Sequence, residues 1–158
     1  MHGRDDAFYK AQFGATFRAA PGMAHEHGLV ADLELRPNGA TPFAGCSVFA
    51  FRTTKTPECI LHADRAGGIL IACDALHNLV GPDEYFSDQS SQKMREMGFF
   101  QPANIGPVWM RINEPKAEDF LRLQTLSFRH AICGHGPPLR DTAREAYAAR
   151  FQRTFASR

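Results

Sequence analysis

The chain has 158 residues, of which 44% are hydrophobic and 22% charged, as is ordinary for one globular domain with a single core. Its 13 phenylalanines exclude an intrinsically disordered chain. The 18 basic and 17 acidic residues nearly balance, so there is no electrostatic case for nucleic acid or an anionic membrane as a partner. Because no apolar run approaches the roughly 20 residues that span a bilayer and no signal peptide is apparent, we expect a cytoplasmic protein.

The first half of the chain predicts one short helix followed by strands. The helix covers residues 5–13 and ends at Gly14, because a glycine commonly closes a helix. Alternating apolar and polar residues, or short apolar runs, then predict strands. These strands cover residues 15–20, 29–35, 47–51, 58–62 and 69–73, of which 29–35 is expected to be half-buried and 69–73 to be buried on both faces.

After Asp74 the pattern changes. Residues 81–113 contain several glycines and prolines, a short predicted helix over 91–97, and bulky side chains that we expect at the surface, Phe99 and Trp109 among them. Further on, a strand is predicted over 129–133, between helices over 118–126 and 141–155. Early strands flanked by helices favour α/β layers over an all-α or all-β fold.

The four cysteines, at positions 46, 59, 73 and 133, are widely spaced, and each lies within or beside an apolar stretch. No C-x-x-C pair occurs, which argues against a zinc site built from thiolates. We therefore predict four reduced, buried thiols.

Three segments carry residue types that can do chemistry. His2, Asp5 and Asp6 precede the first helix, where they are either metal ligands held close together or helix caps. Asp74 follows a buried strand, where α/β proteins place functional groups, and it either binds a metal or cation or caps the next turn. His135 stands between two glycines after a short strand, which opens the backbone to close approach, although a plain turn histidine fits as well.

The order of these segments resembles the metallo-β-lactamase-like hydrolases. A His/Asp cluster that leads a helix, a strand ending in Asp-Ala-Leu at Asp74, and a strand followed by Gly-His-Gly-Pro at His135 appear in the family's order over nearly the whole chain. The resemblance implies an α/β fold, a partial αββα sandwich in which a mixed sheet is flanked by helices. We expect one domain over residues 1–158, with residues 81–113 as a lid or insertion.

The resemblance also implies a ligand set, which is incomplete here. His2, Asp74 and His135 fall on metal-ligand positions, zinc or iron being the expected metal. The D-H pair of the family motif H-x-H-x-D-H falls on Arg4-Asp5, or on Asp5-Asp6 if the register slips by one, and Asp5 and Asp6 are the candidate catalytic residues. That motif lacks its first and last histidines in this sequence. The position of the family's third ligand falls on Lys55, whose ammonium can pair with Asp74 in place of a metal.

The remaining candidate residues concern a substrate. We expect Lys55, His77, Phe99 and Trp109 to contact a small-molecule ligand in an apolar cleft, since His77 is only three residues from Asp74. The His25-Glu26-His27 segment follows a Pro-Gly turn and predicts a surface loop.

Family members carry several strands before their first motif, whereas this chain begins at that motif. We therefore expect either a shortened protein or a partner that supplies the missing half. Open sheet edges invite pairing, so we expect a homodimer in which strands or helices cross between subunits.

Three functions remain open from the sequence. The first is a metal-dependent hydrolase of an ester, thioester or lactone-type substrate, in which the metal lowers the pKa of a bound water. The second is a metal-free homologue, without cofactor, that binds a small ligand. The third is an oligomerising domain without a ligand. The fold does not decide among the substrates.

Overall fold

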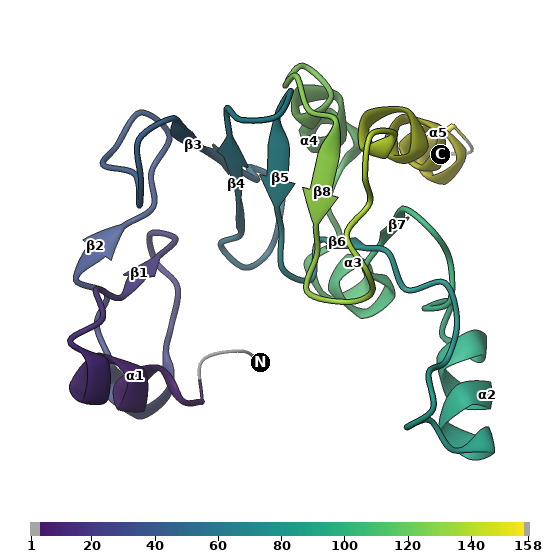
Figure 1. The fold of residues 1–158 in the computed structure, drawn as a ribbon, viewed down its shortest axis with the longest axis horizontal. Coiled ribbons are helices and arrows are strands. Elements are labelled where there is room, and N and C mark those ends of the chain that lie inside the picture. Colours follow the sequence, from purple (N-terminus) through teal and green to yellow (C-terminus); the bar gives the residue numbers. More distant parts are fainter. Residues whose placement is uncertain (1–3, 157–158) are drawn as a thin grey trace.

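The computed structural model describes residues 4–156, which form a mixed α/β arrangement of helices and three small sheets (Figure 1). In chain order the elements are α1 (Asp6–Phe13), β1 (Arg18–Ala19), the 3₁₀ helix η1 (Glu26–Gly28), β2 (Leu33–Glu34), β3 (Cys46–Ala50), β4 (Cys59–Ala63), β5 (Ile69–Ile71), β6 (Leu76–His77), α2 (Asp88–Glu96), β7 (Asn104–Ile105), α3 (Pro107–Asn113), α4 (Ala117–Leu123), β8 (His130–Ile132) and α5 (Ala143–Phe155).

The central sheet has the strand order β3-β4-β5-β8. The first three strands pair antiparallel, and β5 pairs with β8 in parallel. A parallel pair needs a long crossover, and the chain between β5 and β8 contains β6, α2, β7, α3 and α4. The two-stranded antiparallel sheet of β6 and β7 forms within that crossover.

One face of the central sheet packs against α3, α4 and α5 to form the core. Ile60 and Leu70 of the sheet are fully buried in it. Phe120 of α4 contacts aromatic rings from three directions, with centroid distances of 5.8 Å to Phe51, 4.7 Å to Phe151 and 5.0 Å to Phe155. Edge-to-face and tilted ring contacts of this kind stabilise a core beyond the area that they bury. We call residues 46–156 the main body.

A buried carboxylate connects α4 to the loop after β3. Asp119 has no exposed surface and accepts hydrogen bonds from the backbone N–H groups of Arg52 and Thr53 at 2.9–3.0 Å, and from the Thr53 hydroxyl at 2.6 Å. Arg122, one helical turn further on, donates to it at 2.6 Å. These donors satisfy a charge that would be costly to bury alone.

Residues 4–45 form a second region, which we call the N-terminal lobe. Figure 1 shows α1 and the β1–β2 pair at one end of the molecule and α5 at the other. The buried apolar residues of the lobe are Ala19, Ala20 and Leu35. The carboxylate of Asp32 accepts a hydrogen bond from the Phe17 N–H at 2.9 Å and forms an ion pair with Lys10.

The predicted elements are largely present, but several bounds were wrong. The predicted strands over 15–20 and 29–35 shrink to two residues each, and β2 is exposed rather than half-buried. The helix predicted from residue 91 begins at Asp88, because the Ser87 hydroxyl accepts a hydrogen bond from Ser90 N–H and caps it. β6, β7 and α3 were not predicted from the sequence. Two-residue strands such as β6 and β7 depend on tertiary pairing rather than on a local pattern.

The expected surface position of two bulky residues was also wrong. Trp109 is 6% exposed, lies 5.0 Å from the Phe51 ring centroid and donates its indole N–H to Glu58 at 3.1 Å. Phe99 is 9% exposed. Both side chains are buried against earlier segments of the chain, Trp109 against Phe51 and Phe99 against His77 of β6.

All four cysteines are free thiols, as predicted, but their predicted burial was wrong. Cys46, Cys59 and Cys133 are half-buried and Cys73 is exposed. None of the helices described between residues 4 and 156 combines the length and the apolarity that a membrane crossing requires.

Candidate metal site

The parallel pairing of β5 and β8 brings together two residues that the sequence analysis selected. Ile71 lies opposite Ile132, and Asp74 and His135 each follow three residues after this pair. The carboxyl ends of parallel strands meet at one sheet edge, where α/β proteins place ligand sites. The Nε2 atom of His135 lies 3.1 Å from Oδ1 of Asp74, which confirms that these two side chains meet.

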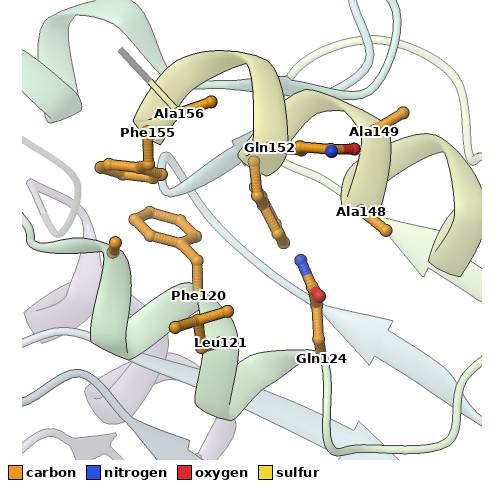
Figure 2. A pocket seen from close by; sticks show the side chains of 10 residues that line it. Phe120, Leu121, Gln124, Ala148, Ala149, Gln152, Phe155 and Ala156 are labelled. Atoms are coloured by element: carbon orange, nitrogen blue, oxygen red, sulfur yellow. The ribbon is translucent and has the colours of Figure 1, made fainter. Parts of the chain in front are cut away.

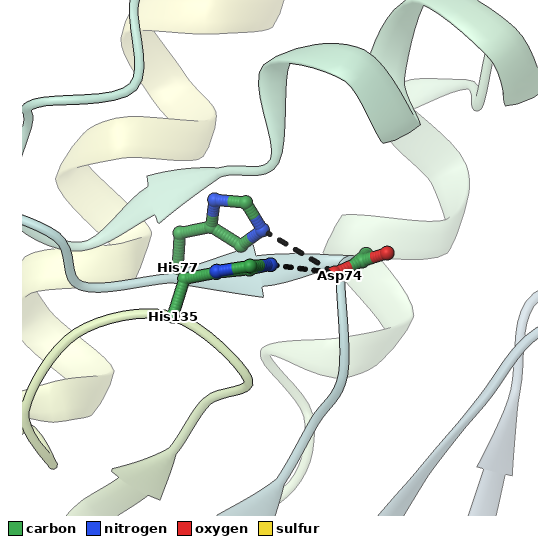
Figure 3. Close-up of side chains that lie close together, drawn as sticks. All are labelled: Asp74, His77 and His135. Atoms are coloured by element: carbon green, nitrogen blue, oxygen red, sulfur yellow. Dashed lines mark hydrogen bonds and ion pairs between the residues drawn. The ribbon is translucent and has the colours of Figure 1, made fainter. Parts of the chain in front are cut away.

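His77, at the end of β6, completes the group (Figure 3). Its Nε2 atom lies 3.8 Å from the same Asp74 oxygen, and its ring centroid lies 4.6 Å from that of His135. One ligand atom from each of Asp74, His77 and His135 lies within 4.8 Å of the other two. Within residues 4–156 no other three His, Cys, Asp or Glu side chains converge in this way.

The burial of His77 distinguishes it from an ordinary surface histidine. Its side chain is 3% exposed, and neither ring nitrogen has a hydrogen-bond partner among the described residues. The Asp74 oxygen at 3.8 Å lies beyond hydrogen-bond distance. A buried donor or acceptor left in this state costs about 1–3 kcal/mol. The ring is held by Phe99, whose centroid lies 5.7 Å away.

The backbone of His77 is fixed from the side of α5. The hydroxyl of Tyr147, a fully buried residue, donates to the His77 carbonyl at 2.9 Å. The Cys133 sulfur lies 3.1 Å from the same hydroxyl. Burial raises the pKa of Tyr147, so this hydroxyl stays protonated and remains a donor.

Asn78 connects the loop that carries His77 to the loop that carries His135. Its backbone N–H donates to the His135 carbonyl at 2.9 Å, and its side-chain amide donates to the Pro137 carbonyl at 2.8 Å. Its side-chain oxygen accepts from the Ala103 N–H at 3.2 Å. One buried side chain therefore sets the distance between the two histidines.

Two glycines permit the close approach of these loops. A Cβ atom on Gly106 would lie 2.0 Å from the Asp74 carbonyl oxygen and 3.0 Å from Nε2 of His77. A Cβ atom on Gly136 would lie 2.1 Å from the Asn78 carbonyl oxygen, and its φ of +87° is one that other residues rarely adopt. Larger side chains at these positions would push the group apart.

The thiol of Cys73 adjoins the group in sequence. Although the residue is exposed overall, desolvation of the thiol and the neighbouring Asp74 carboxylate raise its pKa to about 11. The Cys73 sulfur is not among the ligand atoms that converge at Asp74, His77 and His135.

The other sequence-predicted residues lie elsewhere. His2 lies outside the described residues. Asp5 and Asp6 begin α1 in the N-terminal lobe, and neither belongs to the group of Asp74, which lies in the main body. Asp5 occupies the position before the helix without forming a side-chain cap.

Of the four candidate substrate residues, His77 and Phe99 lie at the Asp74 group and the other two make contacts elsewhere. Phe99 lies beside His77, with its ring centroid 5.7 Å from the imidazole. The Lys55 ammonium forms an ion pair with Glu114 at 2.6 Å, and the Trp109 indole is hydrogen-bonded to Glu58 in the core. A groove of about 530 Å³ lies between α4 and α5, and none of its lining residues belongs to the Asp74 group.

No family model and no curated protein matches this chain. The role of the site therefore has to be argued from its geometry.

Proposed function

We propose that the chain is a metal-dependent hydrolase that binds one zinc or iron ion at Asp74, His77 and His135. The observation that carries this proposal is the convergence of three ligand atoms that include one from His77, a buried histidine whose ring nitrogens have no hydrogen-bond partner among residues 4–156. We further propose that the fold is a partial metallo-β-lactamase-like sandwich. The observed parallel strand pair that ends in Asp74 and His135 supports this interpretation.

The chemistry of the donors fits a borderline divalent ion. Two imidazole nitrogens and one carboxylate oxygen are ligands that zinc and iron accept, whereas magnesium and calcium prefer oxygen alone. A bond from a metal to His77 Nε2 would offset the cost of burying that nitrogen without a partner. Tyr147 and Asn78 then act as positioning residues, because they fix the backbone of both histidine loops.

The exposure of the group favours a catalytic role over a structural one. Structural zinc sites are closed by four protein ligands, whereas catalytic sites have three and leave a position open. The side chains of Asp74 and His135 are 32% and 41% exposed, so small molecules can reach these two ligands. A bound metal would polarise a carbonyl group and lower the pKa of a water molecule. We propose esters, thioesters or lactones as the substrate class.

A second candidate function is a metal-free binding module for a small ligand. The direct 3.1 Å hydrogen bond between His135 and Asp74 favours it, because that contact needs no ion. A metal-free module does not explain why both ring nitrogens of His77 are buried without a hydrogen-bond partner among the described residues, so we prefer the hydrolase. Since all four cysteines are free, we propose the reducing cytoplasm as the location.

Metal titration separates the two functions. Zinc is added to chelator-treated protein, and the bound equivalents and affinity are measured by calorimetry and elemental analysis. We expect one equivalent of zinc in the wild type. In Asp74→Asn and His135→Ala we expect the affinity to fall by at least about 10- to 100-fold, the loss typical when only a hydrogen-bond partner of a metal ligand is removed. His25→Ala is the matched control, since His25 lies in the lobe against the Phe17 ring, 4.7 Å between centroids.

Hydrolysis is then assayed with p-nitrophenyl acetate, an acyl thioester and a γ-lactone, with and without zinc. Zinc binding that is unaffected by Asp74→Asn contradicts the site. Zinc binding at the site without hydrolysis of any of the three substrates contradicts the proposed hydrolase, and a folded wild type that binds no zinc favours the metal-free binding module.

A further inference from the structure

Glu58 lies at the same edge of the central sheet as Asp74 and His135. It is half-buried and directly precedes β4. One row across the sheet consists of paired residues of β4, β5 and β8, namely Leu61, Ile71 and Ile132. Glu58, Asp74 and His135 are each three residues beyond that row, toward one edge, because β4 runs antiparallel to the other two strands. Neighbouring strands lie about 5 Å apart, so Glu58 is next to Asp74 in this row.

Helix α3 links Glu58 to the Asp74 group by a second route. Trp109 of this helix donates its indole N–H to Oε2 of Glu58 at 3.1 Å. Gly106, directly before the helix, lies against the group, since a Cβ atom there would be 3.0 Å from Nε2 of His77. Gly106 and Trp109 are three residues apart, which is about 4.5 Å along a helix axis. The helix that holds the Glu58 carboxylate therefore begins beside His77.

The charge of Glu58 acts at the same place. Burial raises the pKa of the Cys73 thiol to about 11, and the charges of Asp74 and Glu58 both add to this increase. Cys73 directly precedes Asp74, so carboxylates from two neighbouring strands act on one position beside the group. The Glu58 oxygens are not among the ligand atoms that converge at the group. Glu58 is therefore a neighbour of the proposed metal ligands rather than one of them.

Hydrogen bonds fix the orientation of the Glu58 carboxylate. Besides the bond from Trp109, its Oε1 atom accepts from the Cys59 N–H at 3.2 Å. The Glu58 backbone is held as well, because its carbonyl accepts from the Phe51 N–H at 3.0 Å. An ionised carboxylate has about four lone-pair sites, so it can accept hydrogen bonds from more than these two donors. A water molecule is one such donor.

The groove between α4 and α5 lacks a group of this kind (Figure 2). The described residues that line it are apolar except for the amides of Gln124 and Gln152. Neither an amide nor an apolar side chain takes up a proton at neutral pH. The sheet edge that carries Glu58 is therefore the better place for proton transfer.

We propose that Glu58 is the general base of the hydrolase, an inference that rests on the function proposed above. Glu58 takes one proton from the attacking water while the water oxygen bonds to the acyl carbon of the substrate. The bond from that carbon to the leaving oxygen or sulfur then breaks with its electron pair, and the proton passes from Glu58 to the leaving atom. The products are a carboxylic acid and an alcohol or thiol.

Steady-state hydrolysis by the zinc-loaded full chain tests this role, with whichever of the three substrates the wild type hydrolyses fastest. We expect Glu58→Gln to lower kcat by about 100-fold or more with little change in KM, as is typical when a general base is lost. Glu58→Asp keeps a carboxylate and should lose less. Zinc affinity should be retained in both variants, in contrast to Asp74→Asn, since Glu58 is not among the converging ligand atoms.

Acetate binding gives a readout that does not depend on turnover. Acetate represents the carboxylate product, and its charge is repelled by Glu58 if both lie at one site. We expect zinc-loaded Glu58→Gln to bind acetate about threefold or more tightly than the wild type in an NMR titration. Glu114→Gln is the matched control, because Glu114 lies at the opposite end of α3 and pairs with Lys55. It should change neither hydrolysis nor acetate affinity.

The outcomes distinguish this inference from the function on which it rests. A wild type that binds no zinc, or that hydrolyses none of the three substrates, contradicts the hydrolase and the role of Glu58 with it. With an active wild type, three results overturn the role of Glu58 alone: full activity in Glu58→Gln, loss of zinc binding in that variant, or an acetate affinity that the substitution does not change.

Discussion

The main body and the N-terminal lobe are stabilised in different ways. The main body buries a continuous apolar cluster between its sheet and three helices, with Phe120 at 1% exposure among aromatic rings. The lobe buries two alanines and one leucine, and its longest helix buries nothing. Since apolar burial is the dominant favourable contribution to folding, we expect the lobe to open at a free energy well below that of global unfolding.

Each of the two regions nevertheless contains a similar hydrogen-bonded aspartate. In each, an aspartate accepts hydrogen bonds from backbone N–H groups and pairs with a basic side chain. Asp119 does so with no exposed surface, whereas the side chain of Asp32 is 37% exposed. The environment of such a contact, rather than its type, therefore sets its contribution to stability.

The largest effect is expected from Phe120→Ala in the main body. The truncation removes contacts to Phe51, Phe151 and Phe155 and leaves a cavity, which typically costs about 3–5 kcal/mol. Urea unfolding followed by the fluorescence of Trp109, the single tryptophan, measures the change. Leu121→Ala is the matched control, because this neighbouring residue is 64% exposed and its truncation should alter the monomer little. Equal effects of the two substitutions would contradict the core described above.

A somewhat smaller effect is expected from Asp119→Asn. The amide keeps the shape of the side chain but loses the charge, and its NH₂ group then faces a donor. A buried ion pair that loses one partner typically costs about 3 kcal/mol or more, so the urea midpoint should fall clearly. Arg122, the partner, also donates to the Ala50 carbonyl at 3.0 Å, so Arg122→Met tests the same contact from its other side. An unchanged midpoint in both variants would show that Asp119 is not required for the stability of the main body.

The elements of the main body were predicted better than those of the lobe, because the main body buries more apolar surface. Long amphipathic patterns such as that of residues 141–155 report a buried face, and α5 indeed buries Ala143, Tyr147 and Phe151. In the lobe, alternation over 29–35 predicted a half-buried strand, but only Leu33–Glu34 forms a strand and both of its residues are exposed. A local sequence pattern therefore predicts an element correctly where another part of the fold buries the apolar face of that element.

The candidate site was predictable in part. The end of a buried strand identified Asp74, and the flanking glycines identified His135, whose meeting follows from the parallel pairing of β5 and β8. His77 was placed near the site only by its spacing from Asp74. The burial of the His77 ring, without a hydrogen-bond partner among the described residues, depends on β6, β7 and the fold of the crossover. So do the hydrogen bonds that Asn78 and Tyr147 donate to backbone carbonyls of the histidine loops. No local pattern encodes those contacts.

The smallest effect is expected from Asp32→Asn in the lobe, and it should be local. The hydrogen bond from Lys10 and the one from the Phe17 N–H lower the pKa of Asp32 below the ordinary value of an aspartate. A lowered pKa means that the carboxylate stabilises the lobe above that value, and that this contribution is lost as the pH falls through the lowered pKa.

Hydrogen exchange of the Phe17 amide measures this contribution. At neutral pH the Asp32→Asn variant should exchange faster, by less than about tenfold because the pair is solvent-exposed. The difference should vanish in acid, while unfolding followed by Trp109 fluorescence stays unchanged. Glu34→Gln is the matched control, since Glu34 pairs with Arg36. If Asp32→Asn lowered the global unfolding midpoint as much as Asp119→Asn, the lobe would be a cooperative part of the main body and the contrast between the two regions would be wrong.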